Sequence, residues 1–503
     1  ISILSNSGMG IDSIEFAVAI NIMSDKSKCY IGKKGYSIQK NALSQTEMYE
    51  LRKELTVKPN SGIPGYSCSI SYPVYRESTN KLYIPRYFGI EKYGHVSKIN
   101  ILSGVDININ FNGSLFDYQT NIIDKYMKHI GKSGGGLLDV EPGKGKTVMA
   151  LNIISKIKKK TLVVVHKTFL MNQWKERIEQ FLPSAKVGFI QGKTIDTEDK
   201  DIVIGMLQTL STKNFTEEII SEFGLTVYDE CHHLSAEIFS QVMIRINTNY
   251  ILGLSGTMTR KDGLTKVFKW FIGPVVHKEK SESQEEVVIK AVYFEDPHND
   301  EYNNVETDFK GNPQYSKMIS KVCSNENRTS MILNIIQYEL KDNYEQQIMI
   351  LAHNKSLINE LFEKIPLFEE SVGLYIGGMK EEQLKNSETK KIIIATYAMA
   401  SEGLDIKTLT TLLMATPKTD VCQSVGRILR SKHERPLVID IIDNHDIFQR
   451  QYNKRKTYYN KKNYKIQKYN NLTKYLDDDY YLLPKKEAKP KPTCHINVPD
   501  NAF

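Results

Sequence analysis

A glycine-rich stretch at residues 140–147 carries the residue types that bind nucleotide phosphates. It reads Val-Glu-Pro-Gly-Lys-Gly-Lys-Thr and lies between the apolar pair Leu137-Leu138 and an apolar run from residue 148. Glycines let the backbone turn so that its N–H groups face a phosphate, while lysine supplies positive charge and a threonine hydroxyl can ligate Mg²⁺. We therefore predict a nucleoside triphosphate site built from Gly143, Lys144, Gly145, Lys146 and Thr147. A chance glycine turn before a surface helix is the alternative, and the sequence GKGKT disfavours it.

Two acids, Asp229 and Glu230, end an apolar run about eighty residues after Lys146. Hydrolysis of a bound triphosphate needs Mg²⁺ held opposite the loop and a group that orients the attacking water. Asp229 suits the metal and Glu230 suits the water. The adjacent histidines at 232 and 233 could suggest a metal site, but neighbouring residues in extended chain point apart.

A third group lies near the end of the chain, in the stretch Gln423-Ser-Val-Gly-Arg-Ile-Leu-Arg430. Arg427 and Arg430 are three residues apart, on one face of a helix. A guanidinium that reaches a γ-phosphate from another domain is an arginine finger, worth about 10³–10⁵ in rate. A surface helix with salt bridges is the alternative. Gly426 inside such a helix would cost about 1 kcal/mol, which close approach to a facing domain would explain.

Apolar runs alternate with helical patterns in two successive sets, which predicts an α/β fold with two parallel sheets. The runs of the first set are 137–138, 160–166, 201–210, 225–233 and 250–257, and those of the second are 347–352, 372–376, 391–395, 411–415 and 436–441. Ligands gather at the carboxyl ends of strands in such sheets, where the polar residues of the first set fall. The second set has no GKT sequence.

These patterns divide the chain into five parts. We expect an N-terminal α+β domain at 1–112, the two sheet domains at 113–275 and 315–447, a connecting region or small insertion at 276–314, and a basic Tyr/Lys-rich tail at 448–503. A hairpin is expected in the first part, from Ser67–Tyr75 and Lys81–Phe88. Its aromatic and basic residues could form a nucleic-acid surface or a small self-packed sheet, and both readings stay open: Tyr66, Tyr72, Tyr75, Tyr83, Arg86, Tyr87 and Phe88.

Composition limits the class of protein. The net charge is +8, and residues 448–503 hold thirteen Lys/Arg against five Asp/Glu, a difference of +8 that accounts for all of it. Such a tail favours an anionic polymer as partner. The six cysteines form no CxxC pair, which disfavours disulfides and a zinc site. No apolar run is long enough to span a membrane, and Asp12 and Glu15 make a poor signal peptide, so we expect neither membrane association nor secretion.

The order of motifs resembles that of superfamily 2 helicases over roughly residues 113–445, within the XPB-like branch and closest to helicases of large nucleocytoplasmic DNA viruses, the group of the poxvirus transcript-release helicase. The matching motifs are Tyr118-Gln119, GKGKT at 143–147, VVVHKTFLMNQW at 163–174, MLQTL at 206–210, DECHH at 229–233, SGT at 255–257, IMILAHNKS at 348–356, ATYAMASEGLDI at 395–406 and QSVGRILR at 423–430. Arg260-Lys-Asp262 departs from the Arg-Glu-Asp of XPB-like proteins.

The resemblance implies two RecA-like domains and a role for each matched residue. Lys146, Thr147, Asp229 and Glu230 would bind and hydrolyse Mg-ATP, with Thr147 and Asp229 at the metal. The remaining roles are adenine reading by Gln119, coupling of hydrolysis to domain motion by His233, Ser255 and Thr257, nucleotide sensing by Gly403 and Asp405, and completion of the site by Gln423, Arg427 and Arg430.

The resemblance also implies a partner and a setting. The partner would be nucleic acid, DNA rather than RNA, with 3′-to-5′ polarity, in viral transcription or genome handling beside the transcription machinery. The place would be the viral factory in the host cytoplasm, and the virion. Three alternatives stay open: an RNA helicase, the motor of a restriction-type nuclease, and a virion nucleic-acid-binding protein with an accessory ATPase.

Overall fold

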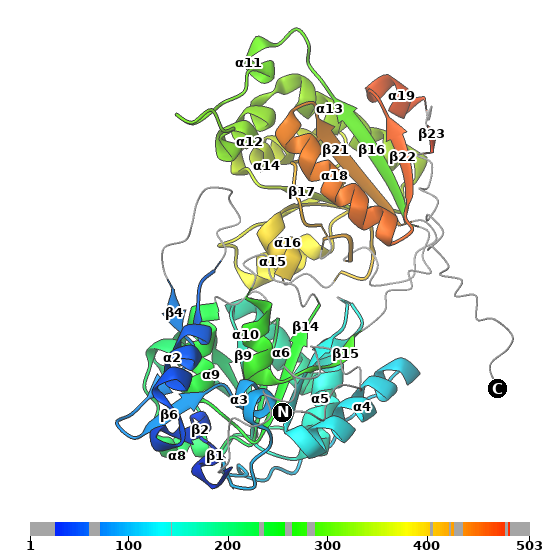
Figure 1. Ribbon diagram of the computed structural model, residues 1–503. Coiled ribbons are helices and arrows are strands. Elements are labelled where there is room, and N and C mark those ends of the chain that lie inside the picture. The colour runs from blue at the N-terminus through cyan, green and yellow to red at the C-terminus, as the bar shows by residue number, and fades with distance from the viewer. Residues whose placement is uncertain are drawn as a thin grey trace, which may run out of the picture. The chain divides into compact units, whose positions relative to one another are not determined.

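The structure is a computed structural model that describes residues 26–59, 71–141, 143–230, 236–256, 264–278, 287–402, 406–421, 424–426, 436–477 and 481–482. The chain divides into two units, Ile1–Lys280 and Ser281–Phe503 (Figure 1).

A small α+β domain begins the first unit. Its five-stranded sheet has the order β5-β6-β2-β1-β7, and only the β1–β7 pair is parallel. The expected hairpin of Ser67–Tyr75 with Lys81–Phe88 is only partly correct. Lys81–Ile84 forms a strand, but its hairpin partner is Arg76–Glu77, Tyr72–Pro73 pairs with Thr56–Val57 instead, and a helix begins at Arg86. The elements are β1 (Cys29–Gly32), β2 (Gly35–Gln39), α2 (Gln45–Glu54), β3 (Thr56–Val57), β4 (Tyr72–Pro73), β5 (Arg76–Glu77), β6 (Lys81–Ile84), α3 (Arg86–Tyr93) and β7 (Ile99–Asn100).

The aromatic and basic residues of this domain serve mainly its own packing. Tyr72, Tyr87 and Phe88 are buried, as is Arg86, so they offer no nucleic-acid surface. Arg86 donates to the carbonyl oxygens of Ser133 and Asn249, both at 3.1 Å, and so ties the domain to the sheet that follows. These four residues therefore pack within the protein, because α3 turns Arg86, Tyr87 and Phe88 inward and Tyr72 is buried in β4. Tyr66 lies outside the described residues.

An eight-stranded sheet forms the core of the first unit, in the order β11-β10-β12-β9-β13-β14-β8-β15. Every pair is parallel except β10–β11. All five predicted strands are present, and β10, β11 and β15 were not predicted. The bounds are β8 (Gly135–Asp139), β9 (Thr161–Val165), β10 (Val187–Gln191), β11 (Thr194–Ile195), β12 (Ile202–Met206), β13 (Leu225–Tyr228), β14 (Tyr250–Ser255) and β15 (Val275–Lys278).

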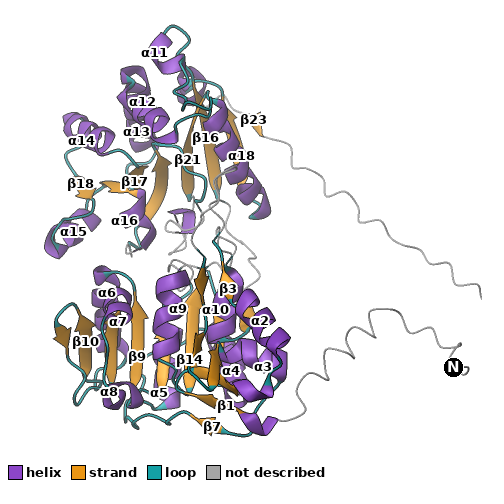
Figure 2. Ribbon diagram, turned by 60° about the vertical axis from the view of Figure 1, so that its left-hand side comes forward, coloured by secondary structure: helices purple, strands orange, loops and turns teal. Residues whose placement is uncertain are grey.

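Helices cover both faces of this sheet (Figure 2). Alternate strand residues explain the two layers: Leu138 and Val163 pack with one set of helices, and Leu137 and Leu162 with the other and with the N-terminal domain. On the first face lie α4 (Asp117–Ser133), α5 (Lys146–Ile157) and α6 (Thr168–Phe181), and on the second α7 (Leu207–Thr212), α8 (Glu217–Ser221), α9 (Ala236–Arg245) and α10 (Thr265–Ile272).

The second unit contains another eight-stranded sheet, in the order β18-β19-β17-β20-β21-β16-β22-β23, with β23 antiparallel. The five predicted strands are again present. The strands are β16 (Val288–Phe294), β17 (Gln347–Ala352), β18 (Val372–Tyr375), β19 (Ile392–Thr396), β20 (Leu409–Met414), β21 (Leu437–Asp443), β22 (Lys465–Tyr469) and β23 (Tyr481–Leu482). The helices are α11 (Asp300–Asn303), α12 (Tyr315–Ser324), α13 (Glu326–Asp342), α14 (Lys355–Lys364), α15 (Glu381–Glu388), α16 (Tyr397–Glu402), α18 (Asp446–Lys461) and α19 (Leu472–Leu476).

The segment 276–314 is not the irregular connection that its composition suggests. β15 ends the first sheet, and β16 lies inside the second sheet between β21 and β22. All but one of the seven β16 residues are buried, including Lys290, whose ammonium group lies 2.7 Å from Glu339. The charge of Lys290 suggested an exposed segment, but the ion pair with Glu339 balances this charge inside the fold.

The segment from residue 448 is also not a separate tail over its first thirty residues. α18 packs on the second sheet, and β22 pairs in parallel with β16. Tyr452, Tyr459, Tyr464 and Tyr469 are buried, so they cannot stack on exposed bases. Tyr452 and Tyr459 lie seven residues apart on α18, and Tyr464 and Tyr469 belong to the core clusters on opposite faces of the second sheet. Residues 478–480 and 483–503 lie outside the described part of the chain.

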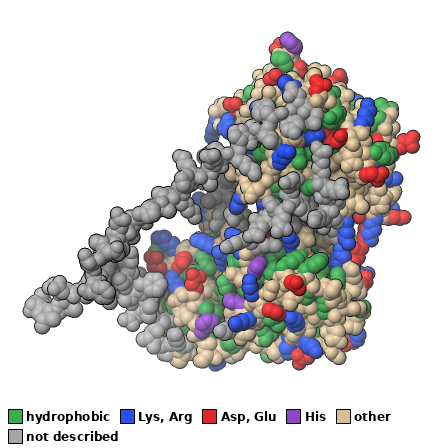
Figure 3. Space-filling view, turned by 90° about the vertical axis from the view of Figure 1, so that its right-hand side faces the viewer, with side chains coloured by type: hydrophobic (Ala, Val, Ile, Leu, Met, Phe, Trp, Pro, Cys, Tyr) green, Lys and Arg blue, Asp and Glu red, His purple; other side chains and the backbone are tan. Residues whose placement is uncertain are grey.

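The lysines and arginines of this region still face solvent in part. Arg450, Lys454, Lys461, Lys465 and Lys474 are exposed. In the face drawn in Figure 3, basic and acidic side chains are interspersed over the described surface of the second unit. No described helix is both long and apolar enough to cross a membrane.

Candidate nucleotide site

The glycine-rich loop connects the end of β8 to the start of α5, so the predicted order of strand, turn and helix is present. Gly143 and Gly145 have φ angles of +85° and +75°, a region that favours glycine. A Cβ atom on Gly145 would also lie 2.4 Å from Nε2 of Gln119. No side chain caps α5, so the N–H groups of its first turn point to where an anion would bind. This loop therefore fits a phosphate group, although Pro142 within it is not described.

Lys146 and Glu230 meet across two strand ends. The Nζ atom of Lys146 lies 2.6 Å from Oε1 of Glu230, and both side chains are largely buried. β8 and β13 are separated in the sheet by β14 alone, so their carboxyl ends bring these residues together. Glu230 has a φ of +45°, uncommon for a residue with a side chain. Such backbone strain collects at functional sites.

Asp229 is buried beneath this pair and is held by a tryptophan. The indole Nε1–H of Trp174 donates to Oδ2 of Asp229 at 2.8 Å, and the backbone N–H of Glu230 donates to Oδ1 at 3.0 Å. Burial, with the charge of Glu230, raises the pKa of Asp229 to about 6, while Lys146 and the two hydrogen bonds act in the opposite direction. Trp174 is not among the site residues predicted from the sequence. Its position in the motif ending at residue 174 was the available signal.

The side-chain amide of Gln119 joins the start of its own helix to the loop. Its Oε1 accepts from the N–H of Phe116 at 3.1 Å, and its Nε2 donates to the carbonyl oxygen of Lys144 at 3.1 Å. The Tyr118 hydroxyl donates to the same carbonyl at 3.1 Å. The rings of Phe116 and Tyr118 are stacked with centroids 5.8 Å apart, and that of Phe116 is 69% exposed. This exposed pair beside the loop was also missed.

Ser255 lies next to the loop, at the end of β14. It stands opposite Asp139 in the parallel register, and its carbonyl oxygen accepts from the N–H of Val140 at 3.0 Å. Thus the structure brings Gln119, the loop, Asp229, Glu230 and Ser255 to one edge of the first sheet. No group of three or more His, Cys, Asp or Glu side chains suited to a metal ion occurs among the described residues.

The other predicted site residues are outside the described part of the chain. They are His233, Thr257, Gly403, Asp405, Gln423, Arg427 and Arg430. Among their neighbours, Val421 and Val425 are buried in the second unit.

Comparison with known proteins shows which protein family the first sheet and its site resemble. Residues 112–260 match the family model described as "Type III restriction enzyme, res subunit". These residues include the loop, the acidic pair and Ser255. The chain is also 31% identical over 202 residues to the "DNA 3'-5' translocase XPB2" of Sulfurisphaera tokodaii, covering 39% of this chain and 44% of that protein.

Two viral proteins match over much more of the chain. The "Putative ATP-dependent RNA helicase L396" of Acanthamoeba polyphaga mimivirus is 37% identical over 493 residues, which are 95% of this chain and 94% of that protein. The "Putative ATP-dependent RNA helicase QP509L" of African swine fever virus is 27% identical over 70% of this chain and 74% of its own length. The chain therefore belongs to the superfamily 2 helicases of large DNA viruses, which are nucleic-acid-dependent ATPases.

Proposed function

We propose that this helicase hydrolyses Mg-ATP at the edge of the first sheet and uses it to move along DNA with 3′-to-5′ polarity. The main observation in support of this site is the contact between Lys146 and Glu230. It joins a loop suited to bind phosphate to a carboxylate suited to activate water.

The described residues divide the chemistry among them. Lys146 neutralises the β- and γ-phosphates, and the loop N–H groups hold them. A γ-phosphate competes with Glu230 for Lys146, so substrate binding releases the carboxylate to orient water. Thr147 and Asp229 would hold Mg²⁺, which would supply Lewis-acid stabilisation of phosphate charge. Trp174 keeps Asp229 in place and favours its charged form.

Adenine recognition and coupling complete this part of the proposal. Gln119 reads the adenine edge, and the exposed rings of Phe116 and Tyr118 offer a flat surface on which a purine can stack. Ser255, with His233 and Thr257, couples the hydrolysis of ATP to motion of the domains. In the second unit, Gly403 and Asp405 sense nucleotide, and Gln423, Arg427 and Arg430 act on the γ-phosphate.

DNA is our preferred substrate because of the relative named as a DNA translocase. Two viral relatives that match over most of the chain are named as RNA helicases, which favours RNA as the second candidate. We further propose a setting in viral transcription or genome handling, in the viral factory and the virion, in contact with the transcription machinery.

The test is ATP hydrolysis by the full chain with single-stranded DNA, duplex DNA or RNA of the same length and sequence. We expect the greatest stimulation by DNA. Unwinding of partial duplexes with a 3′ or a 5′ tail then reports polarity. Stimulation by RNA alone would replace the DNA assignment, and nicking of a plasmid would reveal a nuclease.

A further inference from the structure

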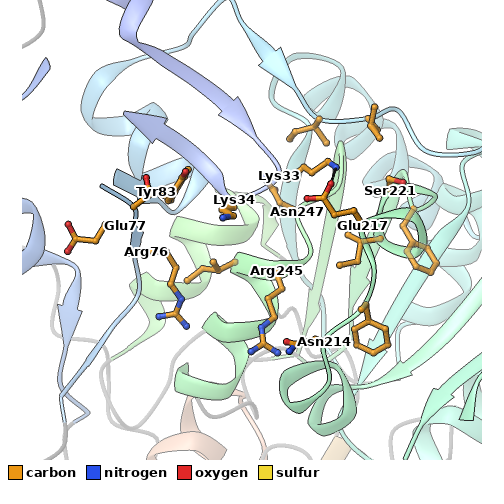
Figure 4. A pocket seen from close by; sticks show the side chains of 17 residues that line it. Lys33, Lys34, Arg76, Glu77, Tyr83, Asn214, Glu217, Ser221, Arg245 and Asn247 are labelled. Atoms are coloured by element: carbon orange, nitrogen blue, oxygen red, sulfur yellow. Dashed lines mark hydrogen bonds and ion pairs between the residues drawn. The ribbon is translucent and has the colours of Figure 1, made fainter. Parts of the chain in front are cut away.

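A pocket separate from the candidate ATP site lies between the N-terminal domain and the first parallel sheet (Figure 4). Its volume is about 500 Å³, within the range of about 300–1,000 Å³ typical of ligand sites. Its walls come from the β1–β2 turn, the β5–β6 hairpin, the chain after β7, α8 and the end of α9. Phe223 and Asn247 in its lining precede β13 and β14. The pocket therefore lies towards the amino ends of these strands, whereas the ATP site follows their carboxyl ends.

The floor of this pocket is apolar and reaches the surface. Leu102, Phe215, Phe223 and Ile244 are among the residues that line it. Leu102 is 54% exposed, and Ile99, three residues earlier on the edge strand β7, is 52% exposed. Exposed apolar surface beside a concave site is typical of a place where another molecule binds.

Three positive charges surround the floor without a carboxylate to balance them. Lys34, Arg76 and Arg245 line the pocket, and none of them forms an ion pair with any described acid. In Figure 4 the side chains of Arg76 and Arg245 extend in the same direction. The guanidinium of Arg245 is held in place by donation to the carbonyl oxygens of Ser211 and Lys213, at 2.6 and 3.3 Å. A positioned cation loses little freedom when it binds an anion.

Both carboxylates of the lining already have cationic partners. Glu217 lies 3.0 Å from Lys33, and Glu77 lies 2.8 Å from both Lys40 and Arg52. The hydrogen bonds from Arg52 and Lys40 hold the pKa of Glu77 below its usual range, so it stays charged and paired. The unbalanced charge at the mouth of the pocket is therefore positive.

We propose that this pocket, which we call the interdomain pocket, binds a short peptide segment of a partner protein, with a large apolar side chain flanked by Asp or Glu. The apolar side chain enters between Leu102, Phe215 and Ile244. The flanking carboxylates meet Lys34, Arg76 and Arg245. A few buried apolar anchors and arginine contacts carry most of the affinity at such interfaces.

Single-stranded nucleic acid fits these observations less well. Protein–DNA interfaces are more polar and more positively charged than protein–protein interfaces, whereas this floor is built of aliphatic and phenylalanine side chains. Tyr83, the tyrosine of the lining, already has Lys34 over its ring at 5.0 Å, which leaves that face closed to a base.

The experiment selects displayed random twelve-residue peptides against the full chain and measures Kd for the enriched peptides by fluorescence anisotropy. We expect enrichment of Leu or Phe between acidic residues. Arg76→Glu and Leu102→Asp should each raise Kd at least tenfold, because they reverse a charge at the mouth and place a charge in the floor. Both residues are exposed, so the variants should fold, which circular dichroism verifies.

Matched controls make the same changes away from the pocket. Lys53→Glu reverses an exposed charge on α2, and Leu367→Asp replaces a leucine that is 85% exposed in the second unit. Both should change Kd less than twofold. The proposal would be overturned if no peptide is enriched, or if Arg76→Glu and Leu102→Asp leave the Kd of the enriched peptides unchanged.

A second arm distinguishes a nucleic-acid site. If Arg76→Glu and Lys34→Glu weaken binding of a labelled thirty-nucleotide single-stranded DNA tenfold and reduce its salt dependence, the pocket is a nucleic-acid surface and the peptide assignment is wrong. The proposal does not depend on the ATP chemistry. Basal ATPase activity of the pocket variants should equal that of the unaltered chain, so failure of either proposal can be recognised separately.

Discussion

At the scale of single residues, the candidate site combines side chains with opposite demands. In the proposed role Asp229 must be ionised to hold a metal, yet it is buried, and burial alone favours its neutral form. Lys146, the Trp174 indole and the N–H of Glu230 offset that cost. The same carboxylate therefore depends on neighbours from three elements, α5, α6 and the end of β13.

The first prediction separates phosphate binding from hydrolysis. Lys146→Ala removes the cation that contacts the phosphates, so both nucleotide affinity and turnover should fall. Glu230→Gln keeps the shape but removes the carboxylate that orients water, so ATP should still bind while kcat falls by about 10² or more. Binding of a fluorescent ATP analogue and steady-state hydrolysis measure the two effects. Wild-type turnover by Glu230→Gln would contradict the assignment.

The second prediction concerns pH. Because the ionised form of Asp229 is the active one, kcat/KM should fall on the acid side, with a midpoint near pH 6 in the free enzyme. Trp174→Phe removes a hydrogen bond to the charged form, so the midpoint should move to higher pH by roughly one unit, since such a bond contributes about 1.5 kcal/mol. An unchanged midpoint in Trp174→Phe would show that the indole contributes only packing.

The sign of the stability effect is opposite to that of activity. The folded state holds the Asp229 proton more tightly than the unfolded chain does, because the pKa of this carboxyl is about 6 in the folded state and its ordinary value is 3.8. The contribution of this group to the free energy of unfolding therefore decreases as pH rises through the window from about 4 to 6, and it stays low above it. Asp229→Asn should flatten that dependence in denaturant titrations.

At the scale of elements, α18 connects the second sheet to the chain that leads into the arginine segment. Arg455 of α18 forms two hydrogen bonds of 2.8 Å with Asp440 and also donates to the carbonyl oxygen of Lys418. Lys418 is five residues before Gln423. Both Arg455 and Asp440 are 1% exposed, and a broken buried pair costs about 3–5 kcal/mol. Arg455 is thus placed to position the segment that would carry Arg427.

The third prediction uses a matched pair in the same unit. Arg328 and Asp443 are equally buried and form bonds of 2.6 and 2.9 Å. Arg455→Lys and Arg328→Lys should therefore lower Tm to a similar extent. At a temperature where both remain folded, Arg455→Lys should lower kcat about tenfold with little change in ATP affinity, and Arg328→Lys should not. Equal kcat values for the two variants would remove the positioning role of Arg455.

At the scale of the whole molecule, the proposed function needs residues from both units. The loop and the acidic pair belong to the first, and Gln423, Arg427 and Arg430 belong to the second. Removal of residues 448–503 would delete α18 and β22 and leave one side of β16 unpaired. We therefore expect such a truncation to abolish basal ATPase activity, rather than only to weaken binding of nucleic acid.

The fourth prediction tests cooperation between the units. Arg427→Ala should lower kcat by about 10³ or more with ATP affinity nearly unchanged, because an arginine finger acts mainly on the transition state. Lys454→Ala, an exposed cation on α18, is the control and should change neither value. A loss of affinity without a loss of kcat would instead assign Arg427 to ground-state binding.

Much of this protein follows from local sequence. All ten strands predicted for the two parallel sheets occur, because a buried parallel strand is a continuous apolar run that can be recognised without knowledge of its neighbours. The loop conformation can also be predicted locally, because glycine favours the positive φ angles found at Gly143 and Gly145. Family resemblance and the 37% identical viral relative agree on the class of enzyme.

Other features required the tertiary structure, since they depend on residues distant in sequence. Trp174 and Asp229 are fifty-five positions apart and meet because β9 and β13 are neighbours. β16 and β22 contain lysines whose charges are paired or directed outward only within the folded sheet. The sequence left both a surface role and a packing role open for Arg86, and α3 turns its side chain inward. Local patterns report how strongly a segment prefers to be buried, whereas pairing between distant segments decides which charged and aromatic side chains the core can accept.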